Sequence, residues 1–498
     1  MEKLSRTIVS HNDVLLPTAA CTGVVALFVV AAVGGLSPLL PNLLIVLASI
    51  ALFLFLKPIA CLYLLLLLSL FQNILGFWFE SLYVGTWRDI LTIGILGIIT
   101  VKFIITKRGF WVRTPITGLL FLFAALIFVQ IFNPALPSIG MGIFGFRAYF
   151  VPMLGFFIGL NFITSRRELK RIGFFLLVFL SLAAVVGIIQ AKMGFGSYEN
   201  LSQYIRTDIA HYYSGYSWYR VSSIFGTVWE FGNLMSFMIL LSLPLYNIME
   251  NKRSRTLLFL AISILFTGLI ASAALSSIYS ACLGICVYAV LLKKRKFSFV
   301  VASIAAISLS AIYLERVGWE RVILYFFSDL QHQRLFATIP FHEALVGNLK
   351  SNFLGKGMGI SLDSVGMRFG LSHSLFMEKF PDLTMEGDYF MLMNQAGFPG
   401  MILLIIIHVK IIAWARRIQR LLFDTFLKSV AFGISILMIS AIVTSLFRTF
   451  LAQRPLDLFI WIATGLLFSL PRLEEREREA RKNGEHPHLK PHRMAWRR

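Results

Sequence analysis

Basic residues in this chain gather in clusters, and two apolar runs separate each cluster from the next. The clusters are Lys107/Arg108, Arg166/Arg167/Lys170/Arg171, Lys252/Arg253/Arg255, Lys293 to Lys296, and Arg416/Arg417/Arg420. Lysine and arginine are retained on the cytoplasmic side of a membrane. The spacing therefore predicts a series of helical hairpins that cross a membrane, with the cytoplasmic connections marked by the clusters.

The composition also indicates a membrane protein. Hydrophobic residues make up 57% of the chain, charged residues 14%, and the mean hydropathy is +0.77. A membrane-spanning helix needs about 20 mostly apolar residues. We predict an all-α polytopic membrane protein with about fourteen transmembrane helices and a large, partly helical external loop. The expected spans are 18–35, 38–56, 58–78, 89–105, 115–132, 148–163, 172–190, 231–248, 256–272, 275–292, 297–313, 388–408, 425–446 and 455–471.

These spans divide the chain into four parts. Residues 1–313 form a transmembrane bundle with an external loop at 191–230, and residues 314–387 form the large external loop. Residues 388–471 supply the last transmembrane helices, and 472–498 form a basic cytoplasmic tail. An even number of spans places both termini in the cytoplasm, and the first span is expected to be a retained helix.

The net charge of +21 does not indicate nucleic-acid binding, because the excess lies in cytoplasmic loops and the tail, where it fixes topology and contacts anionic lipid. The chain has no GxxxxGK[ST] motif, no HExxH motif and no Cys/His metal-ligand spacing. We therefore expect no cofactor and no metal, and membrane lipids as contacts.

Aromatic residues crowd the first external loop. Tyr213, Tyr216 and Trp218 lie close together there. One interpretation is an aromatic belt at the membrane interface. The other is a sugar-binding surface, since flat rings stack on the apolar faces of pyranoses, and these rings are too close together for all of them to be membrane anchors.

External arginines are a second signal, because topology disfavours them on that side. The candidates are Arg147, Arg220, Arg316, Arg321, Arg334 and Arg448, with Arg206, Arg368 and Arg454 also external. A guanidinium binds phosphate oxygens through two parallel hydrogen bonds and can offset the charge of a pyrophosphate leaving group. The alternative is that these side chains reach lipid phosphates or pair with acids such as Asp89 or Asp457.

A third signal lies near the end of the large loop, where His373, Glu386 and Asp388 precede an apolar span. A carboxylate at the membrane boundary is partly desolvated, which suits it to act as a general base. The alternative is a helix cap, because aspartate is favoured at a helix N-terminus. The two roles do not exclude each other.

Three stretches of this chain resemble the O-antigen polymerase/O-antigen ligase superfamily of bacterial membrane glycosyltransferases. The first runs from Arg220 to Asn233 and is similar to the family's external arginine followed by the entry into a span. The second contains Arg334, Glu343 and the Gly355/Gly357/Gly359 turn, whose glycines permit positive φ or close approach to a ligand. The third runs from Asp388 to Gly400.

The resemblance implies a metal-independent, inverting glycosyl transfer at the outer face of the bacterial inner membrane. The donor is a glycan repeat unit or growing chain on undecaprenyl pyrophosphate. Arg220 and Arg334 are expected to hold the pyrophosphate, with Arg147, Arg316, Arg321 and Arg448 as weaker candidates. His373, Glu386 or Asp388 is expected to orient or deprotonate the acceptor hydroxyl, and the tyrosine-rich loop to grip the sugars.

Other functions stay open at this stage. Gly387–Asp388 stands where ligases of this group often carry a His–Asn pair, which favours a polymerase over a ligase that transfers glycan to lipid A-core. A lipid-linked oligosaccharide flippase is the main alternative, although its charges should face a central cavity. A non-enzymatic member of an export complex is a third, and a chain-length regulator is a further expected partner.

Overall fold

The computed structural model describes residues 58–78, 86–106, 114–193, 221–225, 227–272, 274–292, 353–360, 387–447, 450–451 and 453–482. All regular secondary structure in these ranges is helical. The α-helices are α3 (Pro58–Trp78), α4 (Thr86–Thr106), α5 (Thr117–Val129), α6 (Ile139–Phe162), α7 (Arg166–Met193), α9 (Val228–Tyr246), α10 (Lys252–Ala271), α11 (Leu275–Leu292), α17 (Asp388–Leu421), α18 (Thr425–Phe447) and α19 (Leu456–Lys482), and one 3-10 turn, η1 (Gln130–Phe132), follows α5.

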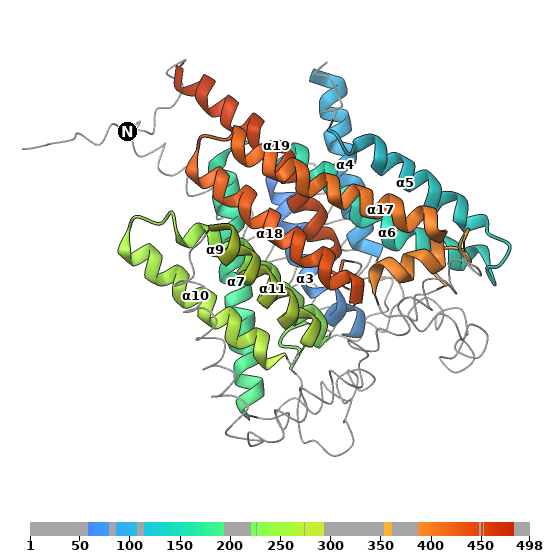
Figure 1. Ribbon diagram of the computed structural model, residues 1–498, viewed down its shortest axis with the longest axis horizontal. Coiled ribbons are helices and arrows are strands. Elements are labelled where there is room, and N and C mark those ends of the chain that lie inside the picture. Colours follow the sequence, from blue (N-terminus) through green and yellow to red (C-terminus); the bar gives the residue numbers. More distant parts are fainter. Residues whose placement is uncertain are drawn as a thin grey trace, which may run out of the picture.

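The helices confirm the predicted fold class, an all-α membrane protein. Seven of those in the described ranges are long and apolar enough to cross a membrane, namely α6, α7, α9, α10, α17, α18 and α19. Helices α17, α18 and α19 run side by side through the middle of the bundle (Figure 1). The predicted spans 18–35, 38–56 and 297–313 lie outside the described residues, so the number fourteen stays a prediction.

Among the described helices, α6 and α19 form the most extensive contact, and glycine residues lie within it. A Cβ atom on Gly155 would lie 2.9 Å from Leu458, one on Gly159 would overlap the Ile462 carbonyl oxygen, and one on Gly465 would overlap the backbone of α6. Small residues let transmembrane backbones come into direct contact, and dispersion then holds them together. This crossing fixes the start of α19 against the middle of α6.

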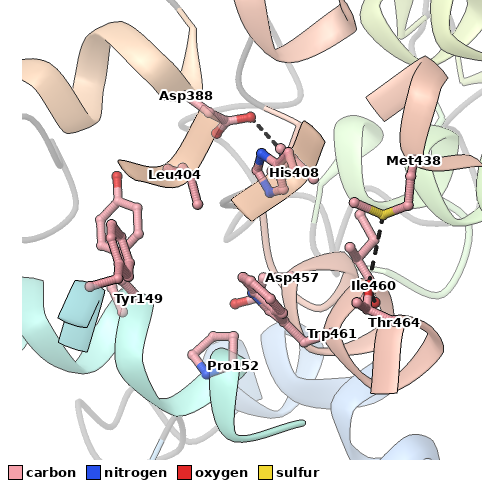
Figure 2. A pocket seen from close by; sticks show the side chains of 13 residues that line it. Tyr149, Pro152, Asp388, Leu404, His408, Met438, Asp457, Ile460, Trp461 and Thr464 are labelled. Carbon is pink, nitrogen blue, oxygen red and sulfur yellow. Dashed lines mark hydrogen bonds between the residues drawn. The ribbon is translucent and has the colours of Figure 1, made fainter. Parts of the chain in front are cut away.

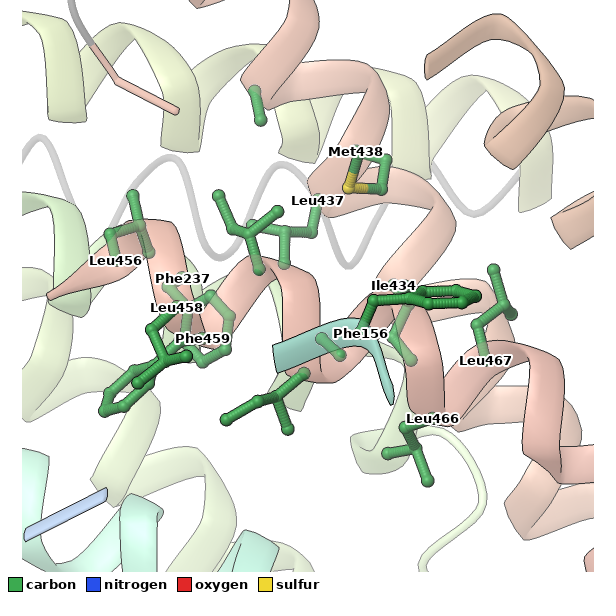
Figure 3. Close-up of a cluster of buried hydrophobic side chains, with 14 of the residues drawn as sticks. Phe156, Phe237, Ile434, Leu437, Met438, Leu456, Leu458, Phe459, Leu466 and Leu467 are labelled. Atoms are coloured by element: carbon green, nitrogen blue, oxygen red, sulfur yellow. The ribbon is translucent and has the colours of Figure 1, made fainter. Parts of the chain in front are cut away.

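Large side chains fill the space around this crossing. Phe156 of α6, Phe237 of α9, Met438 of α18 and Phe459 of α19 are all buried within one apolar cluster (Figure 3). Because lipid is as apolar as these residues, close packing rather than exclusion of water stabilises the interface.

Hydrogen bonds to α19 identify one end of the bundle, which we call the Arg166 end. Glu474 of α19 accepts from the backbone N–H groups of Phe423 and Asp424, at 2.9 and 2.7 Å, in the α17–α18 connection. Asp424 in turn pairs with Arg166, at 2.7 Å, at the start of α7. Helices α4, α17 and α19 begin at the opposite end, which we call the Arg88 end.

Helix α17 is bent and folds back on itself at Gly397, where φ is 74° and ψ is 180°. Tyr389 Oη lies 2.8 Å from His408 Nδ1, although a straight helix would separate these residues by roughly 28 Å along its axis. The helix therefore has a short arm, residues 388–396, and a long arm, residues 398–421. The sequence predicted one span over 388–408, and glycine alone readily adopts the backbone conformation that makes the bend.

Candidate functional site

Buried charges gather at the Arg88 end, where helices that are distant in sequence begin next to each other. Arg88 of α4 is 2% exposed, and its Nη1 lies 3.2 Å from Asp457 Oδ1 of α19. Arg147 of α6 pairs with Asp89, the residue after Arg88. Both acids lie in the first turn of their helices, where the helix dipole favours a negative charge.

Arg454 completes this group, which we call the arginine cluster (Arg88, Asp89, Arg147, Arg454 and Asp457). It lies in the α18–α19 connection and is partly exposed. Burial and the neighbouring Arg88 lower the pKa of Arg454 to about 10, while Asp457 and Asp89 oppose that shift. Among the described residues, Arg88 and Arg147 have ion-pair partners within 4.0 Å and Arg454 has none.

Within the described residues, the arginine cluster has three guanidinium groups and two carboxylates, and the Asp388 carboxylate lies beside it. Arg454 is the one of the three guanidinium groups that has no carboxylate within 4.0 Å among these residues. Two further atoms in this group, Arg88 Nε and Asp89 Oδ1, are buried without a hydrogen-bond partner. A buried charge is costly unless an opposite charge offsets the lost hydration. An anion beside Arg454 would supply that charge.

Asp388 stands beside the arginine cluster and ties two segments together. It is 2% exposed, and its Oδ2 accepts from the backbone N–H groups of Phe450 and Leu451, at 2.8 and 2.6 Å. The carboxylate thus joins the start of α17 to the α18–α19 connection that carries Arg454. Asp388 is the first residue of α17, but Gly387 occupies the cap position, and the Asp388 carboxylate bonds to the α18–α19 connection instead of capping its own helix.

A cavity of about 40 Å³ opens between these residues. Asp388, Asp457, Tyr149, His408 and Thr464 supply its polar lining (Figure 2). The rest of its wall is apolar and comes from α5, α6, the long arm of α17, α18, the α18–α19 connection and α19: Phe123, Ala148, Pro152, Leu404, Met438, Leu451, Ile460 and Trp461. A space of this size holds roughly three water molecules, and its polar groups could bind them.

The Gly355/Gly357/Gly359 turn lies against the short arm of α17. All three glycines have positive φ, of 79°, 101° and 89°, as the sequence allowed. Their close approach is to the protein itself, since a Cβ on Gly355 would lie 2.5 Å from the Gly397 nitrogen. The turn is therefore a docking contact with the bundle in this structure.

The structure describes two of the predicted site residues, Arg147 and Asp388. Both lie at the Arg88 end, and Arg147 pairs with Asp89, one of the two acids that the sequence named as alternative partners. The other predicted residues lie outside the described ranges: Arg220, Arg316, Arg321, Arg334, Arg448, His373, Glu386, Tyr213, Tyr216 and Trp218.

Sequence reasoning missed several residues of this site. Arg88 lies directly before the predicted span 89–105. It could have been found by the same signal as the other candidates, an arginine at a helix end expected to be external. Tyr149 and His408 lie inside apolar runs, and the sequence does not show which other helix each of these side chains packs against. Within the described ranges, no group of three or more His, Cys, Asp or Glu residues could hold a metal ion.

No protein-family model matches this chain, and no curated protein matches it either.

Proposed function

We propose that this protein is a membrane glycosyltransferase that polymerises glycan repeat units carried on undecaprenyl pyrophosphate. The observation that carries the proposal is the arginine cluster, in which Arg454 has no ion-pair partner within 4.0 Å among the residues that the structure describes. A pyrophosphate is the anion that such a donor presents at membrane depth, and guanidinium groups bind phosphate oxygens well. The resemblance of residues 220–405 to O-antigen polymerases and ligases supports the same chemistry.

In this reaction an acceptor hydroxyl oxygen attacks the anomeric carbon of the donor sugar. The bond from that carbon to the pyrophosphate oxygen breaks, its electron pair leaves with the pyrophosphate, and the hydroxyl proton passes to a base. Arg454 would offset the charge that builds on the leaving group. Arg454 alone can bind one phosphoryl group, so the second phosphoryl group of the pyrophosphate would be bound by the predicted residues Arg220 and Arg334.

The acceptor base stays among the predicted His373, Glu386 and Asp388. Asp388 already accepts two backbone hydrogen bonds through Oδ2. Its contribution to the reaction would therefore come through the position of the α18–α19 connection that it holds. Positioning of the acceptor for near in-line attack would supply much of the rate enhancement.

The charge distribution supports a site on the outer face of the bacterial inner membrane. Arg166 and the Arg416/Arg417/Arg420 group lie toward the end of the bundle opposite the arginine cluster. Basic clusters mark the cytoplasmic side. The arginine cluster would then face outward, where lipid-linked glycans are assembled, and the termini would lie in the cytoplasm.

A lipid-linked oligosaccharide transporter is the second candidate, and one observation favours it. Arg88, Asp457 and His408 lie inside the bundle near a cavity, which is where a transporter would carry its ionisable residues. A ligase that uses the same donor and lipid A-core as acceptor would need the same phosphate site. The three functions differ in the product that accumulates when the protein is missing.

The test is the glycan profile of a deletion strain complemented with wild type, Arg454→Gln or Arg416→Gln. Arg416 is an exposed arginine on α17 toward the Arg166 end, so it is the matched control. We expect single repeat units on the normal acceptor without the protein, long chains with wild type and Arg416→Gln, and at least tenfold fewer long chains with Arg454→Gln.

Other profiles would contradict parts of the proposal. Full-length polymer stranded on its lipid carrier would identify a ligase. Repeat units retained on the cytoplasmic face would identify a transporter. Normal long chains with Arg454→Gln would remove the arginine cluster from the site.

A further inference from the structure

A single glutamine connects the glycine turn to the cavity. Gln395 lies on the short arm of α17 and is fully buried. Its side-chain Oε1 accepts from Gly359 N–H at 2.8 Å, and its Nε2 donates to Tyr149 Oη at 3.3 Å. The backbone carbonyl of Gln395 also accepts from Gly357 N–H at 3.0 Å.

The segment on one side of this glutamine is residues 353–360, which we call the docking segment. Its remaining backbone contacts are with neighbours of the same site: Lys356 N–H donates to the Asn394 carbonyl, Met358 N–H to Gln130, and Phe398 N–H to the Phe353 carbonyl. Side chains from the α5–α6 connection complete the contact, since Gln130 donates to Leu354 O and Asn133 to Gly355 O. The docking segment is therefore held at several points.

The residue on the other side is Tyr149, part of the cavity wall. It lies on α6 two residues after Arg147, which belongs to the arginine cluster. Tyr149, Asp388 and His408 all line the same cavity (Figure 2). One side chain thus links the docking segment, the short arm of α17 and α6.

Glutamine suits this role because its amide carries an acceptor and two donors on a long side chain. A glutamate would have two acceptors and would add a negative charge near Asp388. An alanine would leave the Gly359 N–H and the Tyr149 hydroxyl without a partner inside the protein, which is costly at a buried position.

We propose that Gln395 is a positioning residue that couples docking of segment 353–360 to the wall of the cavity. When the segment is docked, Gly359 holds the amide group of Gln395, and the amide holds Tyr149. When the segment leaves, Tyr149 loses a fixed partner and the wall of the cavity relaxes. Coupling between two sites is reciprocal, so a change at Tyr149 also alters docking.

Hydrogen–deuterium exchange of the full-length protein in detergent tests the coupling without any assay of activity. The readout is exchange in a peptide that covers residues 353–360, whose amides at Lys356, Gly357, Met358 and Gly359 are hydrogen-bonded. The variants are Gln395→Met, which keeps the volume of the side chain, Tyr149→Phe, and both together. Gln419→Ala is the matched control, because Gln419 is a hydrogen-bonded glutamine toward the far end of α17.

We expect Gln395→Met to speed exchange of the docking segment about tenfold and Tyr149→Phe to speed it about threefold. The double variant should exchange no faster than Gln395→Met alone, because the two changes break one chain of contacts. Gln419→Ala should match wild type. The proposal is overturned if Gln395→Met exchanges like wild type, or if Tyr149→Phe has no effect while Gln395→Met does.

A ligand measurement extends the test, and this part rests on the proposed function. Undecaprenyl pyrophosphate should slow exchange of the docking segment in wild type and leave it unchanged in Gln395→Met. Absence of any protection in wild type would count against the proposed substrate. The ligand-free comparison would still decide the coupling by itself.

Discussion

At the scale of single residues, buried ion pairs explain why the arginine cluster holds together. Arg88 is almost wholly buried, and its guanidinium lies 3.2 Å from Asp457. Two charges taken out of water stabilise the fold little as a pair, but removal of one partner leaves the other uncompensated. The acid and the base therefore depend on each other.

Replacement of Asp457 by asparagine is predicted to lower the free energy of unfolding by about 3 kcal/mol, because Arg88 stays charged and buried while the opposite charge beside it is removed. The double replacement Arg88→Met with Asp457→Leu should recover most of that loss. Thermal unfolding in detergent measures both, with Glu479→Gln as a control at an exposed acid of the same helix. Equal midpoints for wild type and Asp457→Asn would contradict this interpretation.

The charge of Arg454 leads to a prediction about pH. Its pKa in the folded protein is about 10, below the ordinary value of 12.5. Burial therefore costs stability at every pH below about 10, and the cost lessens only as the pH rises through that value. At neutral pH Arg454 stays protonated, so anion binding by wild type should be flat from about pH 6 to 9.

Lysine at position 454 would behave differently. It starts from a lower ordinary pKa of about 10.4, and the same partial burial and positive neighbours would lower it further. We expect Arg454→Lys to bind undecaprenyl pyrophosphate at pH 6 and to lose that binding at a lower pH than wild type does. Binding of the two proteins measured from pH 6 upward is the check. The same pH profile in both would show that the surroundings of position 454 do not lower the pKa of a cation there.

At the scale of helices, glycine residues allow α6 and α19 to come into direct contact. Gly159 of α6 and Gly465 of α19 let the two backbones meet. This contact places the first turn of α19, with Asp457, next to the part of α6 that carries Arg147 and Tyr149. The geometry of the candidate site therefore depends on this crossing, which extends from the first turn of α19 to Gly465.

Gly159→Val is predicted to destabilise the protein by about 2 kcal/mol or more, because the added atoms overlap the backbone of α19. Gly173→Val is the matched control, since a Cβ on Gly173 meets no atom within 4 Å. Thermal unfolding in detergent compares the two variants. If Gly173→Val lost as much stability as Gly159→Val, the effect would come from placing valine in a helix and not from the contact between α6 and α19.

Helix ends also differ from the sequence prediction for physical reasons. Helix α6 starts at Ile139, before the predicted 148, because Ser138 accepts a capping hydrogen bond from Met141 N–H at 3.2 Å. Helix α19 continues past Pro471 to Lys482. In this additional length, the Glu474 side chain accepts a hydrogen bond from a backbone N–H group of the α17–α18 connection. Apolar runs locate the part of a helix within the membrane, whereas caps and contacts beyond it decide where the helix ends.

Seen as a whole molecule, the bundle has chemically distinct ends. The Arg166 end carries ion pairs among surface connections, and the Arg88 end carries the buried arginine cluster. In a membrane protein such a difference corresponds to the two faces of the bilayer.

Single cysteines should report which face is which. Leu354 at the Arg88 end is 69% exposed, and Phe423 at the Arg166 end is 72% exposed. In a variant with the four native cysteines replaced, we expect a membrane-impermeant maleimide to label Leu354→Cys, and not Phe423→Cys, in intact spheroplasts. Both should react after the membrane is opened. The reverse pattern would invert the topology and place the arginine cluster in the cytoplasm.

The sequence by itself determined the helical class and the order of the elements. Apolar runs of about 20 residues have no other economical structure in lipid, which is why eleven predicted spans coincide with described helices. The sequence also singled out Arg147, as an arginine expected on the side that topology disfavours, and Asp388, as a carboxylate directly before an apolar span.

Only the tertiary structure decided which of these residues meet. Arg88 and Asp457 are 369 positions apart, and nothing in the chain between them specifies that α4 and α19 begin side by side. The fold-back at Gly397 likewise brings Tyr389 to His408. Local sequence sets backbone propensity and hydropathy, whereas contacts between distant helices depend on the packing of the whole bundle.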